Sequence, residues 1–270
     1  MSDDRIPPIL LVGCGRMGSA MLAGWRERGL APSVAVDPAP AALAQAGPDL
    51  LVVAEPAAIP SEFTPEAVVF AVKPQNAAAT LPDYAGYGGL SVFLSIMAGR
   101  TISGIRAMVG TDAAIVRAMP NTPAAVRQGI TVACPATGVA PAQRDLCESL
   151  LRAIGAVAWV DNENLLDPVT AVSGSGPAYV FLLAELLERA ALEQGIPADL
   201  ARLLARQTVS GSGALLAAAS DDAADLRKAV TSQGGTTEAA LGVLMASDAW
   251  PRALSQAVDA ATRRSRELAG

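Results

Sequence analysis

Hydrophobic residues in the first 160 positions of the chain fall into short apolar runs, with stretches of helical spacing between several of them. Uninterrupted runs rich in valine, leucine, isoleucine and alanine are typical of strands that are covered on both faces of a parallel sheet. The pattern therefore predicts strands at residues 9–12, 34–36, 51–53, 67–72, 91–96, 114–118, 130–133 and 157–160.

Helical patterns lie between several of these runs, among them residues 17–27, 40–46 and 141–153. Strand–helix alternation of this kind predicts an α/β domain with a doubly wound sheet of the Rossmann type. After about Asn162 no further strand pattern occurs. Long helices are predicted there at residues 177–194, 198–219, 224–230, 236–246 and 251–268. We therefore expect two domains, an α/β domain over residues 1–163 and an all-helical domain over residues 164–270.

The predicted helix at 177–194 has few polar positions, chiefly Glu185, Glu188, Arg189 and Glu193. A helix that is apolar almost all round must be buried on most faces. Two arrangements would bury it: a second subunit that covers it, or a place at the centre of a monomeric helical bundle. A helical domain of this size has difficulty burying such a helix alone, so we expect a homodimer or a higher homo-oligomer built from dimers.

Composition excludes several classes of partner. The 270-residue chain has a net charge of −6 and no basic run, so we expect no nucleic acid. Cys14, Cys134 and Cys147 form neither a disulfide framework nor a CxxC motif, which favours reduced thiols in the cytoplasm. The apolar runs are shorter than the roughly 20 residues of a membrane span. The acidic start, MSDDRIPP, does not resemble a secretory signal, so a soluble cytoplasmic protein is expected.

The chain contains no histidine. This excludes serine–histidine–aspartate hydrolysis, histidine-based zinc sites and the histidine acid/base of many dehydrogenases. We expect no metal site. The chemistry must therefore use carboxylates, lysine, hydroxyls, backbone amides or an organic cofactor.

The motif G-x-G-x-x-G occurs at Gly13, Gly15 and Gly18, directly after the first predicted strand and at the start of a helix. In this setting the first glycine permits a tight turn and the second lets the backbone approach a pyrophosphate. The third lets helix and strand pack closely. Amides at the helix N-terminus, where Arg16 and Met17 lie, then hold the negative charge. We expect a dinucleotide to bind here.

Asp37 follows the second predicted strand, near the position where an acidic residue binds the adenosine ribose of such cofactors. Pro38, Ala39 and Pro40 come next, and none of them could hold a 2′-phosphate. The position favours NADH over NADPH. The alternative is that Asp37 only caps the next helix.

Two further polar residues follow predicted strands. Lys73 and Pro74 end the strand at 67–72, where open sheets of this class bind ligands, so the lysine could reach the cofactor. Asn121 lies beyond another strand, between two prolines, and could face the nicotinamide amide. The alternatives are a solvated lysine and a turn-forming asparagine.

Two segments of small and hydroxyl-bearing residues each precede a predicted helix, at residues 173–176 and 232–236. Amides at a helix N-terminus lack intrahelical partners and suit a carboxylate. The alternative is a pair of ordinary capped turns.

These motifs together resemble the pyrroline-5-carboxylate reductase family over essentially the whole chain. The matching segments are residues 13–18, 71–75, 95–100, 116–123, 173–179 and 230–237, and the last of these, VTSQGGTT, is the most specific. Two departures stand out. Gln233 occupies a position where the family usually has proline, and Ala223 lies near another position where the family often has proline. Asp37 also fits poorly with the family's frequent use of NADPH. The expected cofactor is therefore NADP(H) or NAD(H).

The resemblance implies hydride transfer from the cofactor to the C=N bond of 1-pyrroline-5-carboxylate, which gives L-proline. It implies that Ala71, Val72, Lys73, Pro74 and Asn121 contact the cofactor, and that both small-residue segments line the imino acid. Thr237 is expected to be the catalytic residue, bonded near the ring nitrogen. The implied substrate-binding residues are Ser173, Gly174, Ser175, Gly176, Ser232, Gly234, Gly235, Thr236 and Thr237.

Three other functions are compatible with the same architecture. They are another imine reductase, a β-hydroxyacid dehydrogenase and a non-catalytic NAD(P)-binding redox sensor. A β-hydroxyacid dehydrogenase would be expected to carry a catalytic lysine in the helical domain, where the chain offers only Lys228. The intact hydroxyl and amide segments argue against a sensor.

Overall fold

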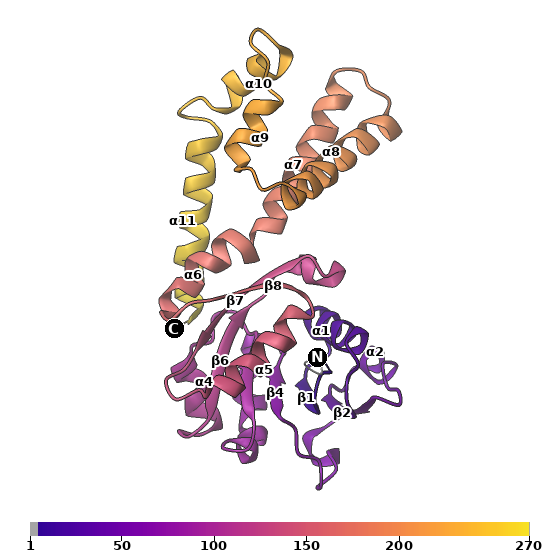
Figure 1. The fold of residues 1–270 in the computed structure, drawn as a ribbon, viewed down its shortest axis with the longest axis vertical. Coiled ribbons are helices and arrows are strands. Elements are labelled where there is room, and N and C mark those ends of the chain that lie inside the picture. Colours follow the sequence, from indigo (N-terminus) through magenta and orange to yellow (C-terminus); the bar gives the residue numbers. More distant parts are fainter. Residues whose placement is uncertain (1–4, 270) are drawn as a thin grey trace. The chain divides into compact units, whose positions relative to one another are not determined.

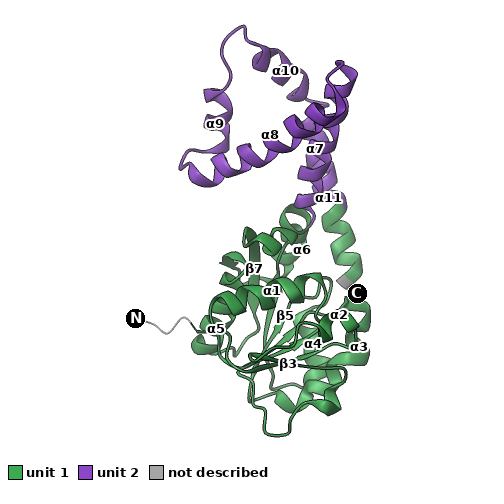
Figure 2. Cartoon of the chain, turned by 90° about the vertical axis from the view of Figure 1, so that its right-hand side faces the viewer, with its two compact units in different colours: residues 1–174, 261–270 green, residues 175–260 purple. Residues whose placement is uncertain are grey.

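The computed structural model describes residues 5–269 (Figure 1). The chain divides into two compact units, residues 1–174 together with 261–270, and residues 175–260 (Figure 2). The predicted boundary between the dinucleotide-binding and helical domains, at residues 163 and 164, lies within the first unit. The division into these two functional domains stays a prediction. Each unit is described by itself.

The first unit is built on one eight-stranded sheet, which confirms the predicted Rossmann-type α/β class. The strand order is β3-β2-β1-β4-β5-β6-β7-β8. The strands are β1 (Ile9–Val12), β2 (Ser33–Val36), β3 (Leu50–Val53), β4 (Ala67–Phe70), β5 (Val92–Ser95), β6 (Ala114–Met119), β7 (Gly129–Pro135) and β8 (Gly155–Trp159).

Neighbouring strands run parallel except for β6 and β7, which are antiparallel. The sequence did not predict this reversal. Its cause is the short connection over residues 120–128, because a parallel crossover needs about a dozen residues or more.

Helices lie on both faces of this sheet (Figure 1). The α-helices are α1 (Arg16–Glu27), α2 (Pro40–Leu43), α3 (Ala77–Thr80), α4 (Ile102–Val109), α5 (Pro141–Arg152) and α6 (Leu166–Val169). The 3₁₀ segments are η1 (Pro56–Ala58), η2 (Pro74–Asn76), η3 (Leu81–Tyr87), η4 (Thr122–Val126) and η5 (Glu163–Leu165), and η6 (Thr170–Gly174) is π-helical.

Alternate residues of β1 pack on opposite faces of the sheet. Leu11 belongs to a core with Trp25 of α1 and Leu150 of α5. Leu10, one position earlier, belongs to the core beneath η3 and α4. The Trp25 indole donates a hydrogen bond of 2.9 Å to the Leu150 carbonyl, so the one polar atom of this buried ring is satisfied.

The strand order reverses at β1, which pairs with β2 on one side and with β4 on the other. Connections on either side of such a point leave in opposite directions, which opens a crevice at the carboxyl ends of the strands. Gly13 and Ala71, the residues that follow β1 and β4, border this point.

The second unit is helical, as predicted. Its helices are α7 (Gly176–Glu193), α8 (Ala198–Ala218), α9 (Ala223–Ala229), α10 (Thr236–Leu244) and the start of α11 (Trp250–Ala269). Helices α7 and α8 pack against each other.

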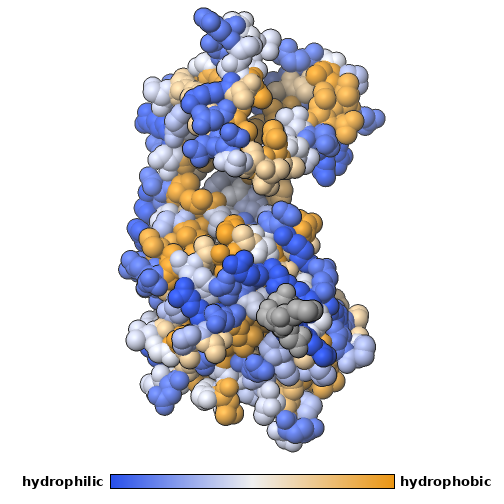
Figure 3. Space-filling model, viewed as in Figure 1, coloured by the Kyte–Doolittle hydropathy of each residue, from blue (hydrophilic) through white to orange (hydrophobic). Residues whose placement is uncertain are grey.

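Helix α7 is apolar but has no buried residue within the chain. Phe181, Leu182 and Leu186 are 67%, 51% and 43% exposed. Figure 3 shows apolar side chains gathered on the surface of this helical unit. The monomeric-bundle alternative for this helix is therefore wrong, and its apolar face is available to another subunit.

The segments η5, α6, η6 and α7 join into one helical run, residues 163–193. By length and composition alone this run could cross a membrane, and only 6% of its most apolar window is buried within the chain. The sequence predicted no span, because interruptions by polar residues hid the length of the run. An apolar helix that another subunit covers meets the same criteria.

The last residues of the chain pack with the first unit. The Ser265 hydroxyl donates a buried hydrogen bond of 2.7 Å to the Asp167 carboxylate. Gly99 has φ +67°, and a Cβ added there would lie 3.0 Å from the Leu268 carbonyl oxygen. The end of α11 thus contacts the connection between β5 and α4.

Candidate dinucleotide and imino-acid site

The three glycines of the G-x-G-x-x-G motif have different steric surroundings. Gly13 has φ +98°, and a Cβ there would lie 2.9 Å from the Ala71 carbonyl. A Cβ at Gly18 would collide with the Gly13 carbonyl oxygen, so the start of α1 packs directly on the turn. A Cβ at Gly15 would meet no atom within 4 Å. The open space at Gly15, beside the N-terminus of α1, suits a pyrophosphate.

A cleft of about 450 Å³ lies at the carboxyl ends of the strands around β1. Six of the predicted cofactor residues line it: Gly13, Gly15, Asp37, Ala71, Val72 and Lys73. This is the crevice expected from the strand order.

The other predicted cofactor residues lie outside the lining. Arg16 and Met17 form the first turn of α1, and Met17 packs against the core. Gly18 is buried against the turn. The Pro74 carbonyl accepts a hydrogen bond of 2.9 Å from the Arg100 guanidinium, and so holds the loop that follows β5.

Sequence reasoning missed one wall of the cleft, which comes from β3 and from the helices that follow β4. Its residues are Ala54, Pro56, Asn76, Ala79, Thr80, Asp83 and Tyr84. Ala54 could have been found, because it directly follows a predicted strand. The residues of α3 and η3 carry no motif that marks them. The Tyr84 hydroxyl has no hydrogen-bond partner among the described residues, and its burial raises the pKa of this phenol.

Asp37 binds the glycine turn directly. One carboxylate oxygen accepts a hydrogen bond of 2.7 Å from the Cys14 amide, and the other accepts one of 2.8 Å from the Ala39 amide. Ala39, not Asp37, is the N-cap of α2. Burial, and secondly the charge of Asp37, raise the pKa of the Cys14 thiol to about 11. Cys14 therefore stays a neutral thiol at physiological pH and presents no negative charge to a phosphate.

The residues of the cleft fit a nicotinamide dinucleotide. The glycine turn leaves room for a pyrophosphate, and Asp37 has further lone pairs for a ribose hydroxyl. Asp37 and Asp83 are carboxylates, and Lys73 is the cation among the lining residues. This charge pattern favours a ribose with a free 2′-hydroxyl over one with a 2′-phosphate.

Residues 232–235 of the second unit precede α10, as the sequence predicts, and the Gly235 amide donates a hydrogen bond of 3.0 Å to the Ser232 carbonyl. Gly234 has φ +71°, and a Cβ at Gly235 would lie 2.5 Å from the Ser232 hydroxyl. Gly235 is the N-cap of α10, and no side chain caps it. Amides in the first turn, which holds Thr236 and Thr237, lack intrahelical partners.

One amide of this loop already meets a carboxylate of the chain. The Gly234 amide donates a hydrogen bond of 2.8 Å to the exposed Glu238 side chain. Glu238 lies at the third position of α10, where an acidic residue commonly satisfies amides of the first turn. The Gly234 amide is therefore paired within the chain, and a role of this loop in binding a substrate carboxylate stays a prediction.

The segment 173–176 precedes a helix as predicted, because Ser175 is the N-cap of α7. The sequence did not predict that residues 170–174 form the π-helical turn η6 within a longer helical run. The Thr170 and Ser173 hydroxyls bond to the carbonyls of Leu166 and Val169, at 2.7 and 3.0 Å. These bonds keep the chain helical through a segment of small residues. π-Helical turns often occur at functional sites.

Asn121 bridges two segments of the first unit. Its Oδ1 accepts a hydrogen bond of 3.0 Å from the Ile130 amide, and its Nδ2 donates one of 3.2 Å to the Ser173 carbonyl. The side chain is 8% exposed and does not line the cleft. Sequence reasoning had placed it opposite the nicotinamide.

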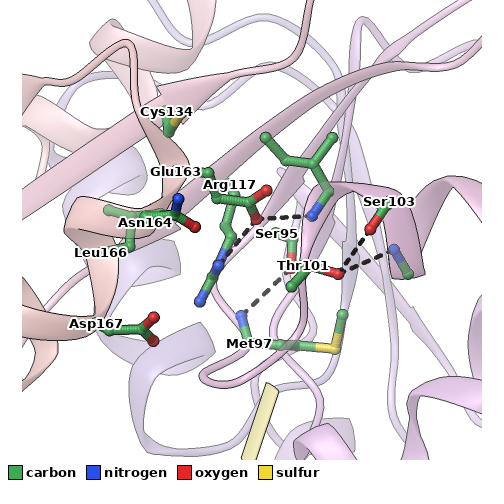
Figure 4. Close-up of polar contacts among 12 residues, drawn as sticks. Ser95, Met97, Thr101, Ser103, Arg117, Cys134, Glu163, Asn164, Leu166 and Asp167 are labelled. Carbon is green, nitrogen blue, oxygen red and sulfur yellow. Dashed lines mark hydrogen bonds and ion pairs between the residues drawn. The ribbon is translucent and has the colours of Figure 1, made fainter. Parts of the chain in front are cut away.

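Arg117 forms a second bridge, from β6 to Glu163 at the start of η5 (Figure 4). Its guanidinium pairs with Glu163 at 2.8 Å, and the same carboxylate oxygen accepts a hydrogen bond of 2.8 Å from the Ile102 amide at the start of α4. The Arg117 side chain is 5% exposed. Arg117 also pairs in register with Ser95, so it lies at the carboxyl edge of the sheet.

Comparison with known proteins agrees with this geometry. Residues 163–268 match the family model described as pyrroline-5-carboxylate reductase dimerisation, and residues 8–99 match the one described as NADP oxidoreductase coenzyme F420-dependent. The pyrroline-5-carboxylate reductase of Pseudomonas aeruginosa is 35% identical over 266 residues, which is 97% of each chain. The chain belongs to the pyrroline-5-carboxylate reductase family. The resemblance stated from its motifs is thereby confirmed.

Solved structures of reductases of this family share the whole fold. The pyrroline-5-carboxylate reductase of Coxiella burnetii superposes with a TM-score of 0.89 at 31% identity, over 98% of this chain and 99% of that one. The pyrroline carboxylate reductase of Plasmodium falciparum, solved with NADP bound, has a TM-score of 0.82 at 26% identity, over 97% and 98%.

These matches also bear on the cofactor and the assembly. The oxidoreductase match over residues 8–99 covers the glycine turn and Asp37, and it confirms the predicted nicotinamide cofactor. The dimerisation match covers α7 and α8, and it confirms that the chain forms a homo-oligomer.

Proposed function

We propose that this protein is a pyrroline-5-carboxylate reductase, which reduces the C=N bond of 1-pyrroline-5-carboxylate with NADPH or NADH and releases L-proline, the last step of proline biosynthesis. The observation that carries the proposal is the 35% identity to a pyrroline-5-carboxylate reductase over 97% of both chains. The cleft beside the glycine turn supports it.

In this function Gly13, Gly15 and the first turn of α1 hold the pyrophosphate, and Asp37 holds the adenosine ribose. Ala71, Val72, Lys73 and Pro74 follow β4 and border the same cofactor. When bound, the reduced nicotinamide supplies the hydride.

The chain's own groups bind and orient the imino acid. The amides of Gly234 and Gly235 donate hydrogen bonds to its carboxylate, as the Gly234 amide does to the Glu238 side chain. Hydroxyls of Ser232, Thr236 and Thr237, together with residues 173–176, accompany the ring, and Thr237 bonds near its nitrogen. A protonated imine is already electrophilic, so these neutral groups suffice, in keeping with a chain that lacks histidine. Holding the reacting carbons about 3–3.5 Å apart supplies much of the rate.

The assembly is a homodimer, or a larger oligomer built from dimers, in which the apolar face of α7 meets a partner subunit. The location is the cytoplasm. The three cysteines are free and buried, as suits a reducing compartment.

The test is the initial rate of pyrroline-5-carboxylate reduction, measured side by side with NADPH and NADH. We expect saturable turnover that yields proline. A six-membered cyclic imine serves as the comparison substrate. No turnover with either cofactor would refute the proposal, and a higher kcat/KM on the six-membered ring would assign the enzyme to broader imine reduction.

A further inference from the structure

The π-helical turn η6 is held against the end of β6 by two contacts. The Ser173 carbonyl accepts the Asn121 side-chain amide at 3.2 Å. Directly beside it, a Cβ added to Gly174 would lie 2.9 Å from the Met119 methyl group. The turn therefore approaches β6 as closely as a residue without a side chain permits.

The two bonds of Asn121 place it between fixed backbone atoms. The Ile130 amide belongs to β7 and so to the sheet, whereas the Ser173 carbonyl belongs to the turn. π-Helical turns are rare and often occur at functional sites. Asn121 ties this one to the sheet.

Arg117 fixes the other end of the same helical segment. It pairs with Glu163, the first residue of η5 (Figure 4), while Asn121 bonds near the end of η6. Arg117, Met119 and Asn121 are alternate residues of β6 and its continuation. One extended segment of the sheet thus fixes both ends of residues 163–174.

We propose that Asn121 is a positioning residue for the imino acid, which acts by holding Ser173 and Gly174 in place, and is not a contact of the nicotinamide. The inference rests on the proposed function, in which these two residues line the substrate. It requires that loss of the Asn121–Ser173 bond weakens substrate binding and leaves cofactor binding unchanged.

Asn121→Asp removes the donor of this bond but also adds a negative charge, so the neutral variant Asn121→Ser is measured beside it. An aspartate keeps the oxygen that accepts from the Ile130 amide but cannot donate to the Ser173 carbonyl. We expect the KM for pyrroline-5-carboxylate to rise about tenfold, the factor that one buried hydrogen bond is worth, with the KM for NADH and NADPH within twofold of wild type. Asn164→Asp is the matched control, because Asn164 is exposed and its side chain forms no hydrogen bond with the described residues.

Amide hydrogen exchange of residues 170–176 gives an independent readout, which should be faster in Asn121→Asp and unchanged in Asn164→Asp. If the aspartate variant does not fold, Asn121→Ser alone tests the inference, with the same expectations. A raised KM for the cofactor with an unchanged KM for the imino acid would make Asn121 a nicotinamide contact and overturn the inference, as would wild-type values for both. Absence of turnover in the wild-type enzyme would instead refute the proposed function.

Discussion

The carboxylate of Asp37 accepts a hydrogen bond of 2.7 Å from the backbone amide of Cys14. This bond joins the end of β2 to the glycine turn, so the residue proposed to read the adenosine ribose also stabilises the turn that holds the pyrophosphate. The Cys14 amide points at a carboxylate and is therefore not among the amides that are free to bind phosphate.

Asp37→Ala should weaken the use of NADH relative to NADPH. The variant loses a charged acceptor for the ribose hydroxyl, which is worth about 10- to 100-fold in kcat/KM. The measurement is the ratio of kcat/KM for the two cofactors. Asp83→Asn, in the same cleft, separates a specific ribose contact from a general effect of negative charge. An unchanged ratio in Asp37→Ala would remove its ribose role.

Gly15→Ala and Gly18→Ala should fail in different ways. Gly15 has φ −65° and open space, so alanine is tolerated by the fold but stands where the pyrophosphate approaches. We expect normal thermal stability and weak NADH binding by fluorescence. At Gly18 the added methyl group meets the Gly13 carbonyl, which should destabilise the fold by about 1–3 kcal/mol. Equal unfolding midpoints for the two variants would contradict this assignment.

Arg117→Met should destabilise the first unit. It leaves the Glu163 carboxylate, whose side chain is 27% exposed, without its cation. Breaking a buried pair costs about 3–5 kcal/mol, and the partial exposure of Glu163 reduces this to about 2–3 kcal/mol. Urea unfolding measures the difference. The matched control is Lys228→Met, which breaks an exposed pair with Asp225 and should change stability by less than about 0.5 kcal/mol. Similar losses in both variants would show that burial of the Arg117 pair is unimportant.

Thr237→Ala should lower kcat/KM for pyrroline-5-carboxylate by about 10- to 100-fold, because it removes the hydroxyl that is proposed to bond near the charged ring nitrogen. Affinity for NADPH should be unchanged. Thr231→Ala is the control in the same loop, since the Thr231 hydroxyl bonds to the Arg227 carbonyl. An equal loss of NADPH binding would place Thr237 at the cofactor instead.

Phe181→Asp should shift the protein toward the monomer. Phe181 is 67% exposed on α7, and a carboxylate buried there by a partner would cost several kcal/mol. Analytical ultracentrifugation measures the mass. Leu90→Asp, at a 75% exposed position of the first unit, should keep the wild-type mass. A wild-type assembly in Phe181→Asp would exclude this face of α7 from the interface.

Most strands could be predicted from the sequence, because buried strands leave an apolar run whatever surrounds them. The run at 9–12 matches β1 at both ends. The direction of β7 could not be predicted, since an apolar run reads the same in either orientation. Only the length of the connection from β6 decides it.

The features that the sequence did not reveal depend on contacts between residues far apart in the chain. Residues 173–176 precede α7 as predicted, but no local pattern reveals that Asn121, 52 residues before Ser173, donates a hydrogen bond to η6. In the same way, no local pattern pairs Arg117 with Glu163, 46 residues further on. Asp37 could be found because its role depends on a fixed spacing from the glycine turn.

The buried bond between Ser265 and Asp167 has a consequence for biosynthesis. A ribosome releases the amino-terminal part of a chain long before the last residues emerge, and such segments commonly fold as they appear. Here the amino-terminal unit lacks the partner of a buried carboxylate until residue 265 has been translated. Asp167 must therefore remain without its hydrogen-bond donor while the whole helical segment between them is synthesised.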